Sequence, residues 1–152
     1  MIKKIHIRRE KTSSISFLLS SIIAILLGVA LDIALAQQAE VIAVGKREFR
    51  HYCALCHGIG GKGESVMTTL NLLTVKPPDL TQLSKKNKDI FPFWRVYRII
   101  DGREEMQGHG TRDMPIWGNV FIRQEGDKLV DETHAIGRIL SIVHYIESIQ
   151  VK

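Results

Sequence analysis

Residues 45–57 read GKREFRHYCALCH, and the interpretation of the whole chain starts from them. They contain the only two cysteines of the 152-residue sequence, Cys53 and Cys56, and His57 follows the second directly. On a helix, residues three apart share a face, so both thiols can reach the two vinyl groups on one edge of a porphyrin. His57 then lies beneath the ring, where its imidazole can ligate the iron. The spacing predicts one haem c, attached covalently through both cysteines.

Two other kinds of site use closely spaced cysteines. A redox-active dithiol of the thioredoxin type needs a strand before the motif, whereas a helix-like stretch precedes this one. A zinc site needs a second pair of ligands at short spacing. No further cysteine exists, and the remaining histidines beyond the N-terminal segment are scattered, at His51, His109, His134 and His144. The sequence therefore favours haem attachment over both alternatives.

The first 36 residues are typical of an export signal. Their basic residues are Lys3, Lys4, Arg8, Arg9 and Lys11, and residues 15–31 carry no charge. Ala34-Leu35-Ala36 then gives the small-x-small pattern that a signal peptidase accepts, which predicts a signal peptide over 1–36 and one domain over 37–152. The uncharged run has 17 residues, the lower limit for a spanning helix, so an uncleaved anchor is the alternative. Either way the domain is expected on the periplasmic side.

The exported part of the chain is close to neutral. The full sequence has 21 Lys and Arg against 16 Asp and Glu, a net charge of +5. Residues 1–36 hold five of the basic and two of the acidic residues, which leaves 16 against 14 and a net charge of +2. No basic cluster with interleaved aromatics remains, so nucleic acid is not an expected partner.

Apolar residues recur at helical spacing in three segments. The first precedes the cysteines, and its stripe consists of Val41, Gly45, Phe49 and Tyr52. The second has Asp89 as a cap, Pro92 in its first turn and Asp101-Gly102 as its stop, and its stripe consists of Phe93, Val96, Tyr97 and Ile100. The third follows Glu132-Thr133, and its stripe consists of Ile139, Ile142, Val143, Ile146 and Ile149. Because no alternating strand pattern of useful length occurs, an all-α domain is predicted.

These blocks resemble the class I c-type cytochromes, in their small bacterial periplasmic form, from Ala39 to the C-terminus. The resemblance implies a cytochrome c fold, in which three to four helices wrap around one covalently bound haem. It also implies that Gly45 and an aromatic residue four positions on cross the C-terminal helix, where Tyr145 matches the aromatic partner.

The resemblance implies further haem contacts around the proximal side. In Pro78-Asp79-Leu80, the Pro78 carbonyl would accept the proton of the second ring nitrogen of His57, and Leu80 would pack on the ring. This segment lies 21 residues after His57, behind an insert that short members of the family lack. Pro77 therefore remains an alternative to Pro78.

The second axial ligand of the iron decides the function. The candidates are Met67, Met106, Met114 and His109. Met67 follows His57 too closely to cross to the opposite face, and Met106 lies in a polar turn. Pro115 pushes Met114 towards an extended backbone, and Met114-Pro115 resembles the family's distal ligand segment, so a His57 and Met114 iron site is predicted. His109, Met106 and an open position remain alternatives, and Trp117 is either a haem-lining or an ordinary core residue.

A thioether ligand favours electron transfer over binding chemistry. We therefore expect a one-electron carrier, not itself an enzyme, between an exported dehydrogenase or reductase and an oxidase or cytochrome complex. It would dock through the haem edge near Cys53 and the glycine loop 58–63, with steering charges on Lys62, Lys85, Lys86 and Lys88. The alternatives are an open or bis-histidine site that reacts with peroxide or binds gases, and a membrane-anchored haem subunit of a larger oxidoreductase.

Overall fold

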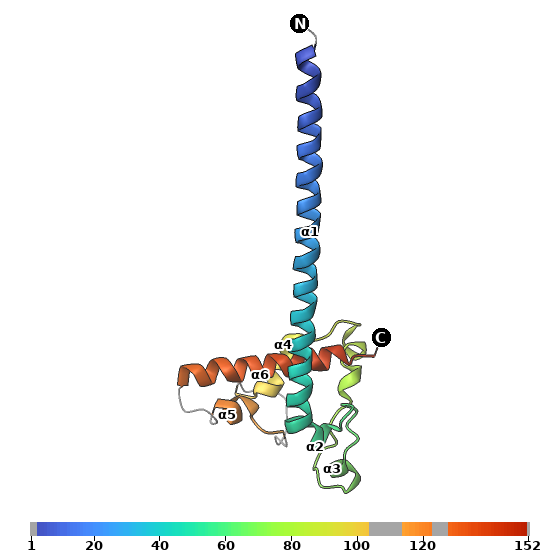
Figure 1. Cartoon of the computed structure of the whole chain (residues 1–152). Helices are drawn as coiled ribbons and strands as arrows, with labels where there is room; N and C mark the ends of the chain where they lie inside the picture. The colour runs from blue at the N-terminus through green and yellow to red at the C-terminus, as the bar shows by residue number, and fades with distance from the viewer. Residues whose placement is uncertain (1–2, 104–113, 123–127, 152) are drawn as a thin grey trace. The chain divides into compact units, whose positions relative to one another are not determined.

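A computed structural model describes residues 3–103, 114–122 and 128–151, with side chains from Ser16 onward and not at 128–130. Over these residues the chain is helical and contains no strand, which confirms the all-α prediction (Figure 1). The α-helices are α1 (Lys3–Glu48), α2 (Ala54–His57), α3 (Val66–Thr69), α4 (Phe93–Asp101), α5 (Trp117–Ile122) and α6 (Lys128–Ser148). These six exceed the expected three to four because α2, α3 and α5 are only one or two turns long.

The chain divides into two compact units, Met1–Ala39 and Glu40–Lys152. In the first unit, the side chains from Ser16 onward are exposed. One helix of the described chain is long and apolar enough to cross a membrane, since an 18-residue window near its N-terminus has a mean hydropathy of 2.5 and no buried residue. Such a segment fits an export signal or a membrane anchor, so the chain carries a feature of exported or membrane proteins.

In the second unit, the end of α1 crosses α6 at Gly45. A Cβ atom at this position would lie 2.5 Å from the carbonyl carbon of Ser141 and closer still to its oxygen. One turn later the rings of Phe49 and Tyr145 pack with their centroids 5.2 Å apart. The crossing expected from the sequence is therefore present, and the absence of a side chain at Gly45 permits the close approach. Val41 is exposed, not part of the buried stripe, because the crossing begins one residue later at Ile42.

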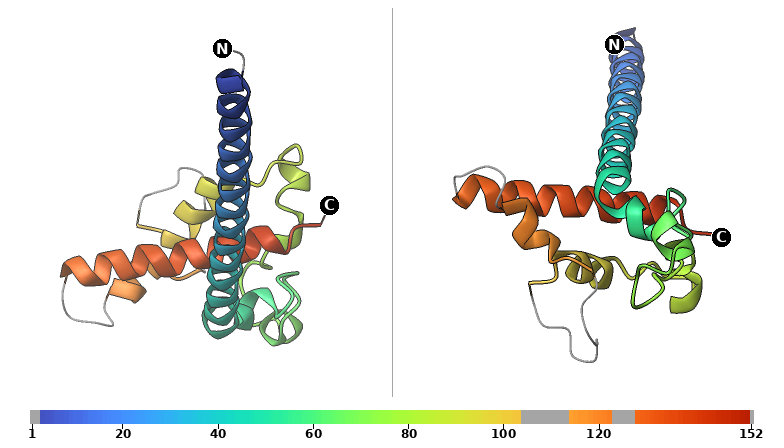
Figure 2. Two further views of the ribbon diagram at one scale, coloured as in Figure 1. Left: turned by 45° about the horizontal axis from the view of Figure 1, so that its top comes forward. Right: turned by 90° about the horizontal axis from the view of Figure 1, so that it is seen from below.

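Helix α6 is the centre of the core. Its side chains Ile139, Ile142, Val143 and Ile146 are buried. Helices α4 and α5 pack against α6 and against each other (Figure 2), and they add Val96, Ile100 and Phe121 to the same apolar cluster. Buried residues thus come from all three helical segments that the periodicity indicated, and Phe121 comes from α5, which the periodicity did not indicate.

The ends of α4 and α6 differ in part from the prediction. Helix α4 ends at Gly102 as expected, with a φ of 67° that glycine adopts without strain. Asp89 does not cap it, because Asp89 is itself in the left-handed region at φ 62° and the helix begins only at Phe93, after Pro92. Helix α6 begins at Lys128, upstream of the expected start near Glu132.

Candidate functional site

The two cysteines follow a change of helical pitch. A π-helical turn, Phe49–Cys53, joins α1 to α2, and it brings Cys53 into the core while Cys56 stays half-exposed on α2. Both thiols are free, so no disulfide joins them. They remain three residues apart across about one helical turn, the separation that attachment to one porphyrin edge requires.

The buried environment of Cys53 disfavours a redox-active dithiol. Burial, with smaller contributions from Glu48 and Cys56, raises the pKa of the Cys53 thiol to about 12. Redox-active dithiols and zinc sites both use the thiolate, which at neutral pH is a minor form of this residue. In the part of the chain that the structure describes, no three His, Cys, Asp or Glu residues are grouped to hold a metal ion. A neutral thioether, in contrast, is compatible with the buried position.

The His57 imidazole is held as a neutral ligand would need to be. Burial lowers its pKa, and the backbone carbonyl of Pro78 opposes this in part by favouring the protonated form. Nδ1 itself is buried and, among the described residues, makes no hydrogen bond of standard geometry. The carbonyl is thus close to the ring without pairing with it fully. With its proton on Nδ1, the ring has a lone pair on Nε2 for a metal.

The glycine loop after the motif holds the segment that contains Pro78. The Gly63 N–H donates to the His57 carbonyl at 2.8 Å, and the Leu80 N–H donates to the Gly61 carbonyl at 2.7 Å. Gly63 has a φ of 72°, and a Cβ there would overlap the carbonyl oxygen of Pro77. The chain therefore needs glycine at this position to bring residues 77–80 beside His57. Leu80 is half-buried against the core.

The C-terminus anchors the same segment from its other side. The Gln150 side-chain amide donates to the Leu80 carbonyl at 2.8 Å and accepts from the Ser84 N–H at 2.9 Å. The Val151 N–H donates to the Thr81 carbonyl at 2.9 Å. Sequence analysis did not find Gln150, because a polar residue after a helix gives no periodic signal.

Met114 and Trp117 are both half-buried against the core. The Trp117 ring lies 5.5 Å from that of Tyr52, centroid to centroid, and 5.6 Å from that of Phe121. Since Tyr52 directly precedes Cys53, these contacts bring the Met114–Trp117 segment to the attachment motif. Trp117 therefore has a core role, which leaves its contact with a cofactor as a prediction.

The structure says less about the other candidate axial ligands. Met106 and His109 lie outside the described residues. Met67 lies in the short helix α3 and is half-buried. A cavity of about 520 Å³ beside this helix is lined by Gly63, Glu64, Thr68, Thr69, Asn71, Leu73 and Lys76. It includes none of the predicted haem-binding residues, so it is a separate feature of the insert.

Arg138 is a site residue that sequence analysis missed. Its guanidinium donates to Glu48 at 2.8 Å and lies over the Phe121 ring at 4.0 Å and the Tyr52 ring at 4.9 Å. It therefore ties α6 to the turn before Cys53 and to α5. The predicted steering lysines, Lys62, Lys85, Lys86 and Lys88, are all exposed.

No protein-family model, curated protein or solved structure matches this chain. The resemblance to class I cytochromes therefore depends on the residues named above.

Proposed function

We propose that this chain is an exported monohaem c-type cytochrome that carries single electrons. The observation that supports it most strongly is the C-x-x-C-H motif together with the placement of His57, whose pKa is lowered by burial and whose buried Nδ1 lies near the Pro78 carbonyl. A redox dithiol does not need that arrangement. A proximal haem ligand does, because a second partner fixes the ring orientation of a metal-bound histidine.

The residues present fit a haem c. Cys53 and Cys56 are free thiols that would hold it through thioether bonds, and His57 would ligate the iron through Nε2. A haem held here would supply reversible one-electron chemistry between Fe(III) and Fe(II). Pro78 would orient the imidazole, and Leu80 would contribute apolar packing on the proximal side.

Met114 is the proposed second axial ligand, because its segment packs against the core and, through Trp117, against the residue preceding Cys53. A thioether raises the reduction potential and occupies the position that substrates or gases would need. This favours an electron carrier over a peroxidase or gas-binding protein. Its partners would be an exported dehydrogenase or reductase as donor and an oxidase or cytochrome complex as acceptor.

The N-terminal unit supports a periplasmic location. Its exposed apolar helix fits either a cleaved signal or an anchor. Cleavage after Ala36 would release the domain, whereas retention would make it a membrane-attached subunit. Sequencing the N-terminus of the mature protein distinguishes the two.

The test is to express the chain with the haem-attachment machinery and to record spectra of the purified protein. We expect haem that remains with the chain after denaturation and is lost in a Cys53→Ala, Cys56→Ala double variant. The oxidised protein should show the weak near-infrared sulfur-to-iron band. Met114→Ala should remove this band completely and allow the reduced form to bind carbon monoxide, because the axial thioether is gone.

Met67→Ala is the matched control, since it removes the other described thioether of the domain and should leave the band unchanged. Absence of covalent haem would refute the proposed function. Covalent haem without the band, with carbon monoxide binding to the unmodified reduced protein, would instead support the open-site alternative.

A further inference from the structure

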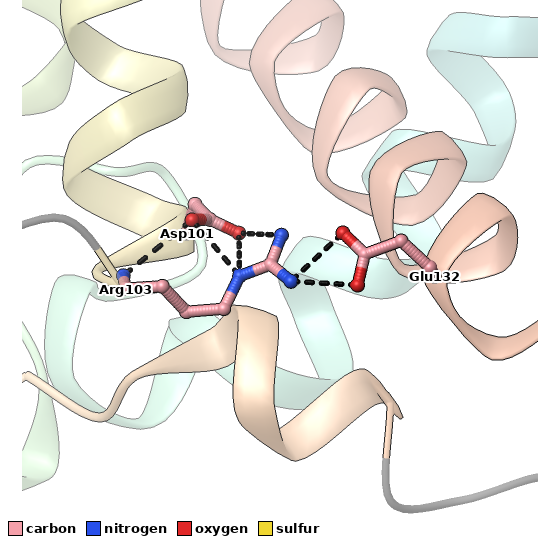
Figure 3. Close-up of polar contacts among 3 residues, drawn as sticks. All are labelled: Asp101, Arg103 and Glu132. Carbon is pink, nitrogen blue, oxygen red and sulfur yellow. Dashed lines mark hydrogen bonds and ion pairs between the residues drawn. The ribbon is translucent and has the colours of Figure 1, made fainter. Parts of the chain in front are cut away.

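Arg103 joins three helices through a cluster of ion pairs with Asp101 and Glu132, here called the Arg103 clamp (Figure 3). Its Nε and Nη2 each donate to Asp101 Oδ1, at 2.9 and 2.8 Å. Its Nη1 donates to both carboxylate oxygens of Glu132, at 2.8 and 2.7 Å. Asp101 is the last residue of α4 and Glu132 lies in α6. The guanidinium thus uses its planar fork to bind carboxylates of two helices.

The third helix of the clamp is α5, which contributes backbone and no charge. A Cβ atom at Gly118 would lie 2.5 Å from Arg103 Nε and closer still to Asp101 Oδ1. The first turn of α5 therefore lies directly on the ion pair, and only glycine leaves room for it. The carboxylate of Asp101 is only 10% exposed, so the contact is shielded from water on most sides.

The clamp also lies near Met114 along the chain. Gly118 follows Met114 by four residues, with the stiff Pro115 between them. The backbone that follows Met114 is thus held about one helical turn away, where Gly118 lies on the ion pair.

We propose that the Arg103 clamp is a positioning device for the sulfur of Met114, the proposed axial ligand. The inference rests on the proposed function. An axial thioether is a weak ligand, so the fraction of molecules in which it is bound depends on how well its segment is pre-positioned. Holding the backbone next to Met114 in place removes entropy that ligation would otherwise have to overcome. Arg103 does not contact the iron in this scheme and acts through Met114.

A role in stability alone would use the same contacts, so the test needs a measurement that folding does not change. The chain offers a control in the same helix, since Glu147 of α6 forms an ion pair with His144 at 3.4 Å. Only Glu132 belongs to the clamp. Glu132→Gln and Glu147→Gln make the same chemical change at the two places. Arg103→Lys keeps the charge and loses the planar fork.

The experiment records the near-infrared band and the rate of carbon monoxide binding by the reduced haem-loaded protein, well below the unfolding temperature. Arg103→Lys and Glu132→Gln should weaken the band and raise the binding rate by about tenfold, the order of effect for one lost charged hydrogen bond. Gly118→Ala should do the same, because its Cβ would displace the clamp. Glu147→Gln should leave the rate within about twofold of the unmodified protein.

The inference is overturned if the three clamp variants keep the band and the unmodified binding rate, or if Glu147→Gln changes them as much as Glu132→Gln does. Covalent haem with an intact band in all variants would refute the positioning role and leave the proposed function in place. An unmodified protein that holds no covalent haem would refute the proposed function and this inference together.

Discussion

Gly45→Ala tests the helix crossing that supports the attachment motif. The new Cβ atom would lie 2.5 Å from the carbonyl carbon of Ser141, closer still to its oxygen, and 3.0 Å from the Cβ of Tyr145. Carbon atoms in contact prefer about 3.5 to 4.0 Å, so the two backbones would have to separate by about 1 Å. The atoms in the way belong to the middle of α6, where no side-chain rotation can relieve the clash.

Two opposing terms set the magnitude of the change in stability. Alanine is a better helix former than glycine by about 1 kcal/mol in a helix interior. Inserting a methyl group into a closely packed core costs about 1 to 3 kcal/mol, and the upper part of this range applies because backbone must move. Separating the helices also loosens the Phe49–Tyr145 ring contact. We therefore expect Gly45→Ala to lower the free energy of unfolding by about 2 kcal/mol.

Gly137→Ala is the matched control. Like Gly45, Gly137 lies within a helix, here α6, but a Cβ there meets no atom within 4 Å. It should raise the free energy of unfolding by about 1 kcal/mol, the helix-propensity term alone. Guanidinium unfolding of the haem-loaded protein, followed by circular dichroism, measures both variants against the unmodified chain. If Gly45→Ala proves as stable as Gly137→Ala, the close crossing inferred here is wrong.

Two further predictions concern the segment beside His57. Gln150→Ala removes the partners of the Leu80 carbonyl and the Ser84 N–H, so it should lower the free energy of unfolding by about 2 kcal/mol. Gln150→Glu keeps an acceptor for Ser84, so its stability should lie between that of Gln150→Ala and that of the unmodified protein. Equal stability of all three proteins would contradict this. The Thr81 hydroxyl, which donates to Asp79 at 2.6 Å, is the main cause that lowers the pKa of that carboxyl below 3.8. The lowered pKa stabilises the folded protein at pH values above 3.8, and this stabilisation is lost as the pH falls through the lowered pKa. Thr81→Val should therefore reduce the decrease in the free energy of unfolding that acid causes, measured by unfolding between about pH 5 and pH 2. An unchanged acid slope would show that the hydroxyl does not control Asp79.

Periodicity in the sequence predicted most of the buried apolar positions of the helices. The stripe of α6 is a property of a single helix, so the pattern of residues three and four apart contains it. The Gly45 crossing joins two helices, and it was expected from the resemblance to class I cytochromes. The stop of α4 at Gly102 is equally local, because it depends on the backbone freedom of one residue. The prediction that Asp89 caps α4 was wrong. Aspartate is a common cap residue, but the backbone of Asp89 is in the left-handed region, which prevents it from starting a helix.

The polar contacts between side chains and distant parts of the chain could not be predicted in this way. Arg103, Arg138 and Gln150 each bind groups that lie far away in the sequence or on other helices. Such contacts depend on where the helices finally lie, and one sequence without a fold gives no register for them. Gly118 carried the clearest unused signal, since a glycine within a short apolar helix often marks a close approach of another group.

The two axial sides of the proposed iron site are held by different parts of the chain. The proximal side depends on Gly63, which admits Pro77 beside it, and on Gln150, which anchors Leu80. The distal side depends on the Arg103 clamp, whose described contacts involve α4, α5 and α6. Because the clamp and the Gln150 contacts share no residue, their effects should be additive. A Gln150→Ala, Arg103→Lys double variant should therefore combine the stability loss of the first change with the carbon monoxide binding rate of the second. Strong coupling between them would mean instead that the site moves as one unit, and that neither ligand is positioned independently.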